Sequence, residues 1–409
     1  MINITDKHNC CGCEACVQTC PKQCIAFVED DEGFRYPIVD ESVCVDCGLC
    51  ERICPMQSMR EINVPLKVLA AYNEDEETRM VSSSGGVFSL LAQQTIDKGG
   101  VVFGARFNEY WQVVIDSAET EEDYKRFRGS KYVQADTNNS FVKCKNLLTE
   151  GREVLFTGTP CQIAGLKSFL RKEYEQLITV DLACHGVPSP KVWNDYLECE
   201  IERQYKTARR AVVGKNTVFH SLSLMSLIKD IRFREKTDGW KKYRFVLQIA
   251  KSPDAGENNS VLSSIHDKNP YFQAFNMGVI LRPCCYTCTL KNQCRSGSDI
   301  TLADFWGIEN VFPSMDDDKG TSLVLVNTEK GDNIIKRIDL SYLESTYEIA
   351  LQYNAGLRVG SNVHPKRKWF YKKYQSSDNV VYILEQSIRA SLFKRFRSFL
   401  SKVKRLIIS

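Results

Sequence analysis

Short apolar runs alternate with amphipathic segments through the middle of the chain. The runs Gly100–Ala105, Glu153–Thr157 and Leu177–Ala183 have the length and composition of buried strands. Between and after them, Ile163–Leu170 and a segment that begins near Pro190 repeat their apolar residues at helical spacing. This alternation predicts βα units and a sheet that contains parallel strands.

Two cysteines follow successive strands of this pattern. Cys161 comes after Glu153–Thr157, and Cys184 comes after Leu177–Ala183. If a standard crossover helix joins the two strands, both cysteines lie at the carboxyl ends of parallel strands, on one edge of the sheet. Open α/β sheets bind their ligands at that edge. We therefore expect Cys161 and Cys184 to converge on one point.

The flanking regions follow other patterns. Val87–Ala92 predicts a helix, and its start at Ser82–Gly86 would leave free N–H groups facing an anion, although a simple helix cap explains the same residues. Gly129–Val133 predicts a loop that leads into a strand. Residues 214–265 are polar, which predicts an irregular region with one strand near Tyr243–Leu247.

Charge and composition exclude several classes of protein. The 409 residues include 54 Lys and Arg against 51 Asp and Glu, and this balance disfavours a nucleic-acid-binding protein. No run approaches the ~18 apolar residues that a membrane span needs, and the N-terminus lacks the apolar run of a secretory signal. We therefore expect a cytoplasmic protein, in which 18 cysteines indicate metal ligation rather than disulfides.

The spacing C-x2-C-x2-C-x3-C-P occurs twice near the N-terminus. Three thiolates on one tight loop can reach three irons of one [4Fe-4S] cluster, whereas the fourth starts a short helix and points to the other cluster, as in two-cluster ferredoxins. The pattern therefore predicts two [4Fe-4S] clusters. One would be held by Cys10, Cys13, Cys16 and Cys54, and the other by Cys44, Cys47, Cys50 and Cys20.

Zinc or disulfides are the competing interpretation of these cysteines. A zinc ribbon uses two C-x2-C pairs and lacks the third and fourth cysteine of each run, so two complete copies in register favour iron–sulfur clusters. Cys11 and Cys24 are surplus to the pattern. We expect both to be small, buried apolar residues.

A later group of cysteines is ambiguous from its spacing alone. Cys285 and Cys288 form a lone C-x2-C, which suits zinc, a redox pair or an iron–sulfur cluster, and Cys161 and Cys184 are candidates for its two partners. The segment Gly158–Ser168 lacks the spacing of a phosphate loop, and no G-x-G-x-x-G follows an expected strand. A nucleotide triphosphatase and a standard Rossmann dehydrogenase are therefore disfavoured.

Four ordered motifs, TGTPCQIAGL, ACHGVPS, RPCCYTC and SDITLADFWG, resemble the coenzyme F-420 hydrogenase/dehydrogenase beta-subunit family, and SSSGGVF, GSKYVQ and HPKRKWF extend the resemblance. That family includes flavoprotein reductases of chlorophyll metabolism. The resemblance implies non-covalent FAD and a third [4Fe-4S] cluster in the main domain. Its implied cluster ligands are Cys161, Cys184, Cys285 and Cys288, with Cys284 or Cys294 as alternatives, and its implied flavin contacts are Ser84, Gly85, Gly86, Lys131 and Thr159.

These parts predict an FAD- and [4Fe-4S]-dependent oxidoreductase. Clusters carry single electrons and a flavin exchanges one or two, so the chain would connect ferredoxin or another redox partner protein with an organic or deazaflavin-like small-molecule substrate. His185 could donate a proton, and Asp304 and Trp306 could contact substrate. A structural histidine, a helix-capping aspartate and a core tryptophan explain the same residues. The alternatives are an electron-transfer subunit without its own substrate and a reductase of surface-polysaccharide assembly.

The predicted fold class is α+β / α/β, with a bacterial-ferredoxin-like N-terminal domain followed by a mixed α/β flavoprotein domain. The ferredoxin-like domain would span residues 1–62, and the two parts of the flavin domain residues 68–150 and 151–370. Residues 378–409 would form a basic amphipathic helix, with apolar residues from Leu392 to Ile407 on one face. Such a helix suits the inner face of an anionic membrane, an acidic partner, or docking on its own core.

Overall fold

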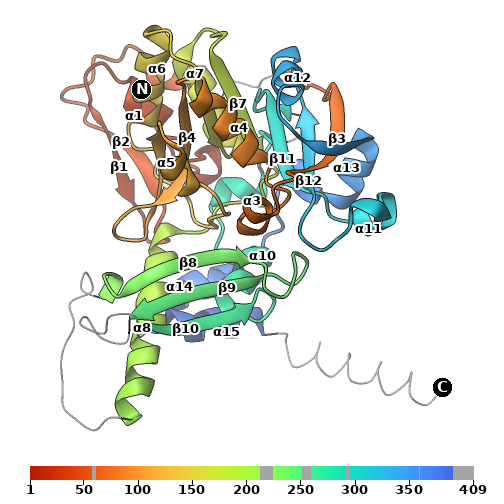
Figure 1. The fold of residues 1–409 in the computed structure, drawn as a ribbon. Helices are drawn as coiled ribbons and strands as arrows, with labels where there is room; N and C mark the ends of the chain where they lie inside the picture. Colours follow the sequence, from red (N-terminus) through yellow and green to blue (C-terminus); the bar gives the residue numbers. More distant parts are fainter. Residues whose placement is uncertain (58–60, 212–223, 251–258, 292–293, 359, 390–409) are drawn as a thin grey trace, which may run out of the picture.

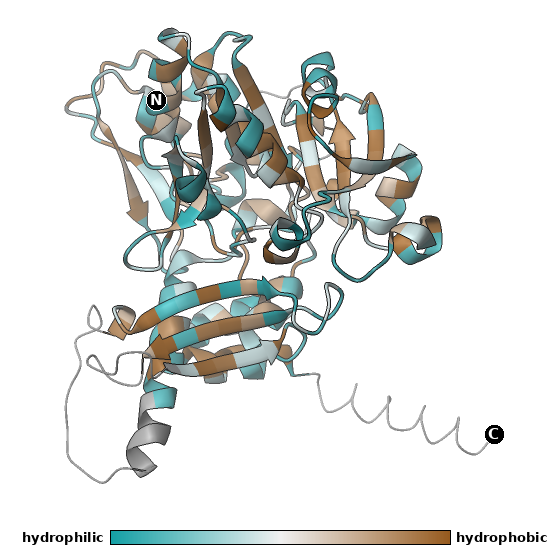
Figure 2. Cartoon of the chain, viewed as in Figure 1, coloured by the Kyte–Doolittle hydropathy of each residue, from teal (hydrophilic) through white to brown (hydrophobic). Residues whose placement is uncertain are grey.

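The structure is a computed structural model that describes residues 1–57, 61–211, 224–250, 259–291, 294–358 and 360–389. Figure 1 shows an N-terminal unit beside a large sheet with helices on both faces, and a smaller sheet that is backed by helices. Figure 2 shows that the strands of the large sheet are mainly hydrophobic and that the loops around it are mainly hydrophilic. The architecture is therefore a mixed α/β protein, as the strand and helix pattern predicts.

The N-terminal unit contains the two copies of the cysteine pattern. Its elements are η1 (Lys7–Asn9), α1 (Ala15–Thr19), β1 (Ile25–Glu29), β2 (Arg35–Val39) and α2 (Leu49–Arg52), and β1 and β2 form an antiparallel hairpin. The two short helices begin in the same way. Glu14 before α1 and Gly48 before α2 both have left-handed backbone, with φ of 61° and 66°. The sequence repeat is thus also a structural repeat.

The large sheet has eight strands in the order β13-β3-β12-β11-β7-β6-β4-β5. Its central strands β4, β6, β7 and β11 are parallel, and the remaining neighbours pair antiparallel. The predicted parallel pairing of the strands that precede Cys161 and Cys184 is confirmed. The strands are β3 (Lys67–Tyr72), β4 (Val101–Phe107), β5 (Val113–Ala118), β6 (Val154–Gly158), β7 (Leu177–Leu182), β11 (Ile300–Asp304), β12 (Ser322–Val326) and β13 (Ser341–Ser345).

Helices cover both faces of this sheet, because consecutive residues of its strands are buried and point to opposite faces. In β4, Val101 and Phe103 pack with residues of α6 and α7, whereas Val102 packs with residues of α4, α5 and α12 on the opposite face. The helices near the sheet are α3 (Glu76–Val81), α4 (Val87–Asp97), α5 (Glu121–Lys125), α6 (Ser140–Thr149), α7 (Pro160–Leu170), α11 (Ile308–Val311), α12 (Glu329–Ile335) and α13 (Tyr347–Tyr353), with the 3-10 turns η2 (Pro283–Tyr286), η4 (Pro313–Met315) and η5 (Ala355–Leu357).

A second sheet lies within the region that the sequence predicted to be irregular. Strands β8 (Ile228–Glu235), β9 (Arg244–Ala250) and β10 (Asn259–Ile265) form an antiparallel sheet in the order β10-β9-β8. The single strand expected near Tyr243–Leu247 is part of β9, but the expectation of irregular structure around it is wrong. Behind this sheet lie α8 (Pro190–Ala211), α10 (Pro270–Asn276), α14 (Arg367–Tyr374) and α15 (Val380–Ile388) (Figure 1).

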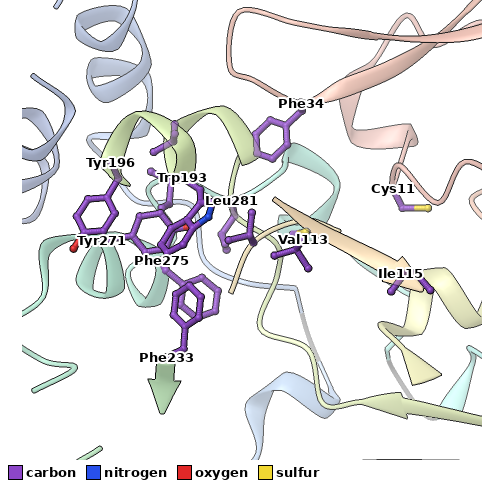
Figure 3. Packing of buried hydrophobic residues seen from close by; sticks show 14 of the residues in the cluster. Cys11, Phe34, Val113, Ile115, Trp193, Tyr196, Phe233, Tyr271, Phe275 and Leu281 are labelled. Carbon is purple, nitrogen blue, oxygen red and sulfur yellow. The ribbon is translucent and has the colours of Figure 1, made fainter. Parts of the chain in front are cut away.

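An aromatic core joins the smaller sheet to its helices and continues towards the N-terminal unit. Trp193, Tyr196, Phe233, Tyr271 and Phe275 are all buried in one cluster, which Figure 3 shows from close by. The same cluster of buried residues includes Cys11 and Phe34 of the N-terminal unit (Figure 3). The N-terminal unit is therefore packed into the core of the main domain.

Two other predicted segments remain. One differs from its prediction, and the other lies outside the described residues. Gly129–Val133 does not lead into a strand: the segment after it makes only an isolated bridge between Val114 and Asp136. Hydrogen bonds between the Ser130 and Ser83 loops hold it instead. The basic helix predicted from Leu392 to Ile407 lies outside the described residues, and α15 ends before it.

Candidate functional site

Four thiols predicted to hold one cluster form a buried group. Cys10, Cys13 and Cys16 lie on α1 and the loop before it, and Cys54 follows α2. None of the four is more than 8% exposed. Burial raises the pKa of the Cys16 thiol, and the neighbouring thiols of Cys10 and Cys54 raise it further. We call this set the first cysteine group.

The second cysteine group contains Cys20, Cys44, Cys47 and Cys50, which line one small cavity with Cys24 beside them. The sulfurs of Cys20 and Cys24 are 3.4 Å apart. Burial, together with this contact, raises the pKa of the Cys24 thiol to about 12. Cys47 is exposed to solvent. Cys24 is buried as expected, but it also touches a group of predicted ligands.

The third cysteine group lies at the carboxyl edge of the large sheet. Cys161 is in the first turn of α7, Cys184 follows β7, and Cys285 and Cys288 lie in and after η2. Burial raises the pKa of the Cys184 thiol, and each of the other three thiols raises it further. Burial and the thiols of Cys161 and Cys285 raise the pKa of Cys288 to about 11. The structure thus brings all four side chains together.

The two alternative ligands have other contacts. The Cys294 thiol donates to Asn327 Oδ1 at 3.2 Å, and Cys294 is not among the thiols that act on Cys184. Cys284 hydrogen-bonds with Cys285, and this bond lowers the pKa of Cys285 to about 7. Because the Cys284 pKa also responds to Cys11, Cys284 lies on the side of the third group that faces the N-terminal unit.

The loops that carry the predicted flavin contacts lie side by side. The N–H and the hydroxyl of Ser130 donate to Ser83 Oγ at 2.6 and 2.9 Å. The Gly85 N–H donates to Ser322 Oγ at 3.0 Å and is therefore engaged inside the protein. A Cβ at Gly85 would lie 2.4 Å from the Ala71 carbonyl oxygen, so close packing against the sheet requires glycine here.

The remaining predicted flavin contacts surround these loops and the third group. Gly86 is the N-cap of α4. Lys131 Nζ donates to the Arg128 carbonyl at 3.1 Å, and loss of hydration lowers the pKa of Lys131 to about 7. The Thr159 hydroxyl lies 3.2 Å from Cys161 Sγ. Thr159 is therefore beside the third group, whereas Lys131 is part of the Ser83–Ser130 contact region.

His185 follows a residue of the third group and points into the aromatic core. Its ring packs edge-on against Phe275 with centroids 5.0 Å apart. Burial lowers the pKa of His185, and the positive charge of Lys291 lowers it further. Within the described part of the chain, Nε2 of His185 is buried without a hydrogen-bond partner. The imidazole is therefore neutral near pH 7 and has one nitrogen free.

Asp304 lies at the end of β11 in an ion pair. It accepts hydrogen bonds from Arg234 Nη1 and, at 3.2 Å, from Trp240 Nε1. The expectation that it caps a helix is wrong, because Gly307 is the N-cap of α11. Trp306 stacks on Trp240 with ring centroids 4.8 Å apart.

Arg234 and Lys236 are features of this edge that the sequence pattern did not predict. Nε and Nη2 of Arg234 are buried and have no hydrogen-bond partner among the described residues. Lys236 Nζ donates to the Ser84 carbonyl at 2.8 Å, which places it on the predicted flavin loop. Lys131 and Lys236 each donate to three backbone carbonyls, and loss of hydration lowers the pKa of both side chains to about 7. The mixture of charged and apolar residues in β8 is typical of any half-exposed strand, so it carried no signal.

The donor sets fit the cofactors that the cysteine pattern implies. Each cysteine group supplies four thiols, the number that one four-iron cluster binds, and ligation would replace their protons with iron. Among the described residues, no group of His, Cys, Asp or Glu is spaced for a single metal ion. The two buried N–H groups of Arg234 that lack a partner among the described residues fit a phosphate or carboxylate.

Comparison with known families separates the chain into the same two regions. Residues 9–58 match the 4Fe-4S dicluster domain, and residues 151–348 match the C-terminal region of the coenzyme F420 hydrogenase/dehydrogenase beta subunit. Residues 151–348 therefore carry the C-terminal domain of the coenzyme F420 hydrogenase/dehydrogenase beta-subunit family. The family resemblance of the four ordered motifs is thereby confirmed. With this domain and the dicluster domain, the chain is an iron–sulfur electron-transfer protein related to hydrogenase and dehydrogenase subunits.

Individual relatives are more distant. No curated protein matches the chain. A solved structure, described as a xenon derivatization of the F420-reducing [NiFe] hydrogenase complex from Methanosarcina barkeri, aligns with 81% of this chain and 92% of that chain at 16% identity and a TM-score of 0.43. In the described part of the chain, no helix combines the length and apolar character required to cross a membrane.

Proposed function

We propose that the chain is an FAD-dependent iron–sulfur oxidoreductase that passes electrons between a one-electron redox protein and an organic or deazaflavin-like substrate. When bound, the clusters would supply one-electron steps and the flavin would convert them to two-electron chemistry. The single observation that carries the proposal is the third cysteine group. Four cysteines from three segments of the chain come together at the sheet edge, beside Thr159.

Residues at different positions of the chain would have different roles in this function. Cys47 and its loop face solvent, which supports contact with an external redox partner at the second cysteine group. Arg234 and Lys131 would hold an anionic part of the flavin or the substrate, because two buried N–H groups of Arg234 lack a partner and no carboxylate pairs with Lys131 among the described residues. Asp304 would orient Arg234 through their ion pair. His185 would offer its free Nε2 to a nearby polar atom.

Anaerobic purification with quantified iron, sulfide and flavin tests the proposal. Three four-iron clusters predict about twelve irons per chain, together with one FAD. About eight irons would remove the third cluster, and zinc in place of iron would overturn the redox function. A colourless preparation without flavin would leave only the dicluster function.

A second assay separates an enzyme from an electron-transfer subunit that lacks its own substrate. The purified chain is mixed with a reduced deazaflavin and an excess of a one-electron acceptor dye under anoxic conditions. Oxidation of the deazaflavin by the chain alone supports the enzyme. A fully loaded chain that transfers electrons to the dye from reduced ferredoxin, but leaves each small organic donor untouched, supports the subunit.

A further inference from the structure

Cys11 joins the first and third cysteine groups. Its thiol lies beside the thiol of Cys13, in the first group, and beside the thiol of Cys161, in the third. Cys11 is only 6% exposed and belongs to the core that Figure 3 shows. Its packing role was predicted, but its position between two sets of predicted ligands was not. One side chain therefore bridges the N-terminal unit and the main domain.

Helix α7 is shaped to receive this loop. Gly165 lies one helical turn after Cys161, on the same face of α7. A Cβ at Gly165 would lie 2.9 Å from Cys13 Sγ and 3.0 Å from Cys13 Cβ. Only a residue without a side chain permits this approach. The Cys13 side chain of the first group therefore packs directly against the backbone of α7, which carries Cys161 of the third group.

Arg282, from the main domain, contacts the loop of the first cysteine group. Its guanidinium donates to the Cys10 carbonyl at 2.8 Å, to Cys10 Sγ at 3.4 Å, and to the Arg35 carbonyl at 2.9 Å. The side chain is fully buried and, within the described part of the chain, it forms no ion pair with a carboxylate. A buried charge without a counter-charge is costly. Cys10 Sγ, which would be a thiolate when it ligates iron, is the group best placed to balance it.

The loop backbone is adapted to the arginine. Gly12 has a φ of +70°, which glycine adopts without strain. A Cβ at Gly12 would lie 3.0 Å from Arg282 Cζ and 2.3 Å from Gln134 Nε2. Gln134 in turn accepts a hydrogen bond from Arg282 Nη1 at 3.0 Å. The left-handed turn therefore makes room for the guanidinium against the first cysteine group.

The second copy of the cysteine pattern provides an internal comparison. Val45 occupies the position of Cys11 in the repeat and is 59% exposed, and Cys47, the counterpart of Cys13, is also exposed. Asp46 stands where the first copy has Gly12 and pairs with the N-terminal amine of Met1. Nothing in the described main domain therefore meets the second loop as Cys161 and Arg282 meet the first.

We propose that the loop from Cys10 to Cys13 is the internal electron-transfer junction of this chain, with Arg282 as a positioning residue that raises the reduction potential of the site held by Cys10. This rests on the proposed function. One electron would enter at the second cysteine group, move to the first and then to the third. At each step one site loses one electron and the next gains one, and no bond forms or breaks. A buried positive charge beside a cluster stabilises its reduced, more negative state.

Anaerobic EPR redox titration of the full chain tests this, with iron content measured on every sample. Removing the charge in Arg282→Gln, which keeps N–H donors, should make one cluster about tenfold harder to reduce, or ~59 mV for one electron, and leave the other two unchanged. Arg282→Lys should restore most of the shift. Arg106→Met, which removes an arginine paired with Asp116 on β5, is the control. An unchanged potential in an iron-replete Arg282→Gln chain would overturn the role of Arg282.

A matched pair of loop variants tests the junction itself. Cys11→Ala should slow electron transfer from the N-terminal sites to the third site at least tenfold in rapid-mixing experiments with reduced ferredoxin, whereas Val45→Ala should not. Equal rates in the two variants would overturn the proposed order. Low iron in the unmodified chain would instead count against the proposed function, so the two failures are distinguishable.

Discussion

Arg367 and Glu32 form a two-pronged ion pair between the first residue of α14 and the turn that joins β1 to β2. Nη1 of Arg367 donates to Glu32 Oε1 at 2.8 Å, and Nη2 donates to Oε2. The side chains are only 12% and 20% exposed. Glu32 belongs to the N-terminal unit and Arg367, 335 positions later, belongs to the main domain. The pair therefore holds the β1–β2 turn of the N-terminal unit against the main domain.

Breaking this pair should loosen the N-terminal unit. Glu32→Gln leaves Arg367 charged and largely buried, which should cost about 2 kcal/mol of docking free energy. Limited proteolysis should then release the unit roughly thirtyfold faster if cleavage follows the open population. Lys7→Met is the control, because Lys7 pairs with Asp30 within the same unit and is 47% exposed. Equal cleavage in all three chains would contradict this role.

Iron content should distinguish the ligands of the third group from their neighbours. Cys161→Ala should remove about four irons per chain and abolish one EPR signal, because Cys161 lies near the other three thiols of that group. Cys294→Ala should retain all irons, since the Cys294 thiol is bonded to Asn327. Loss of four irons from Cys294→Ala would show instead that the C-x2-C pair takes Cys294 as a partner.

Flavin retention should depend on Arg234. Arg234→Met removes a buried cation whose Nε and Nη2 have no hydrogen-bond partner in the described structure, so flavin per chain after gel filtration should fall at least tenfold while iron is unchanged. Arg244→Met, on the neighbouring strand β9, removes an arginine that pairs with Asp238. This control should keep its flavin. An unchanged flavin content in Arg234→Met would show that Arg234 does not bind the anionic part of the flavin.

Stability should vary with pH through Asp181 in β7. This buried carboxyl accepts a hydrogen bond from the Thr301 hydroxyl, and burial raises its pKa from 3.8 to about 6. Since the folded state holds the proton more tightly, stability should fall as pH rises from about 4 to 6 and stay level above. Asp181→Asn should raise stability above pH 6 by at most about 3 kcal/mol. Melting temperatures at pH 5 and pH 8 measure both effects, and a wild-type chain equally stable at both would contradict them.

Local patterns predicted the parts of the fold that local chemistry determines. The runs that became β6 and β7 are mainly apolar because parallel strands are covered on both faces, and their spacing fixed the edge where Cys161 and Cys184 meet. The duplicated cysteine spacing likewise predicted two sets of thiols, because each loop builds three of its four ligands.

Long-range packing was beyond reach of the sequence. Strand β8 was missed because most of its residues are charged and its apolar residues do not alternate strictly, although Phe233 and Ile231 enter the aromatic core. Cys11 was interpreted only as a small buried residue, because nothing in its neighbourhood along the chain points to Cys161. The role of Arg282 was not predicted either, because its partner Cys10 lies 272 positions away in the sequence.

The unequal surroundings of the two cysteine loops have a kinetic consequence. A diffusing carrier must find its acceptor at every turnover, and salt weakens the attraction that guides it. Here the first cysteine loop is already packed against the main domain. Added salt should therefore change only the rate at which an external redox partner binds at the exposed loop around Val45. Ionic strength would then alter how fast the chain is loaded from outside and leave the passage within it unaltered.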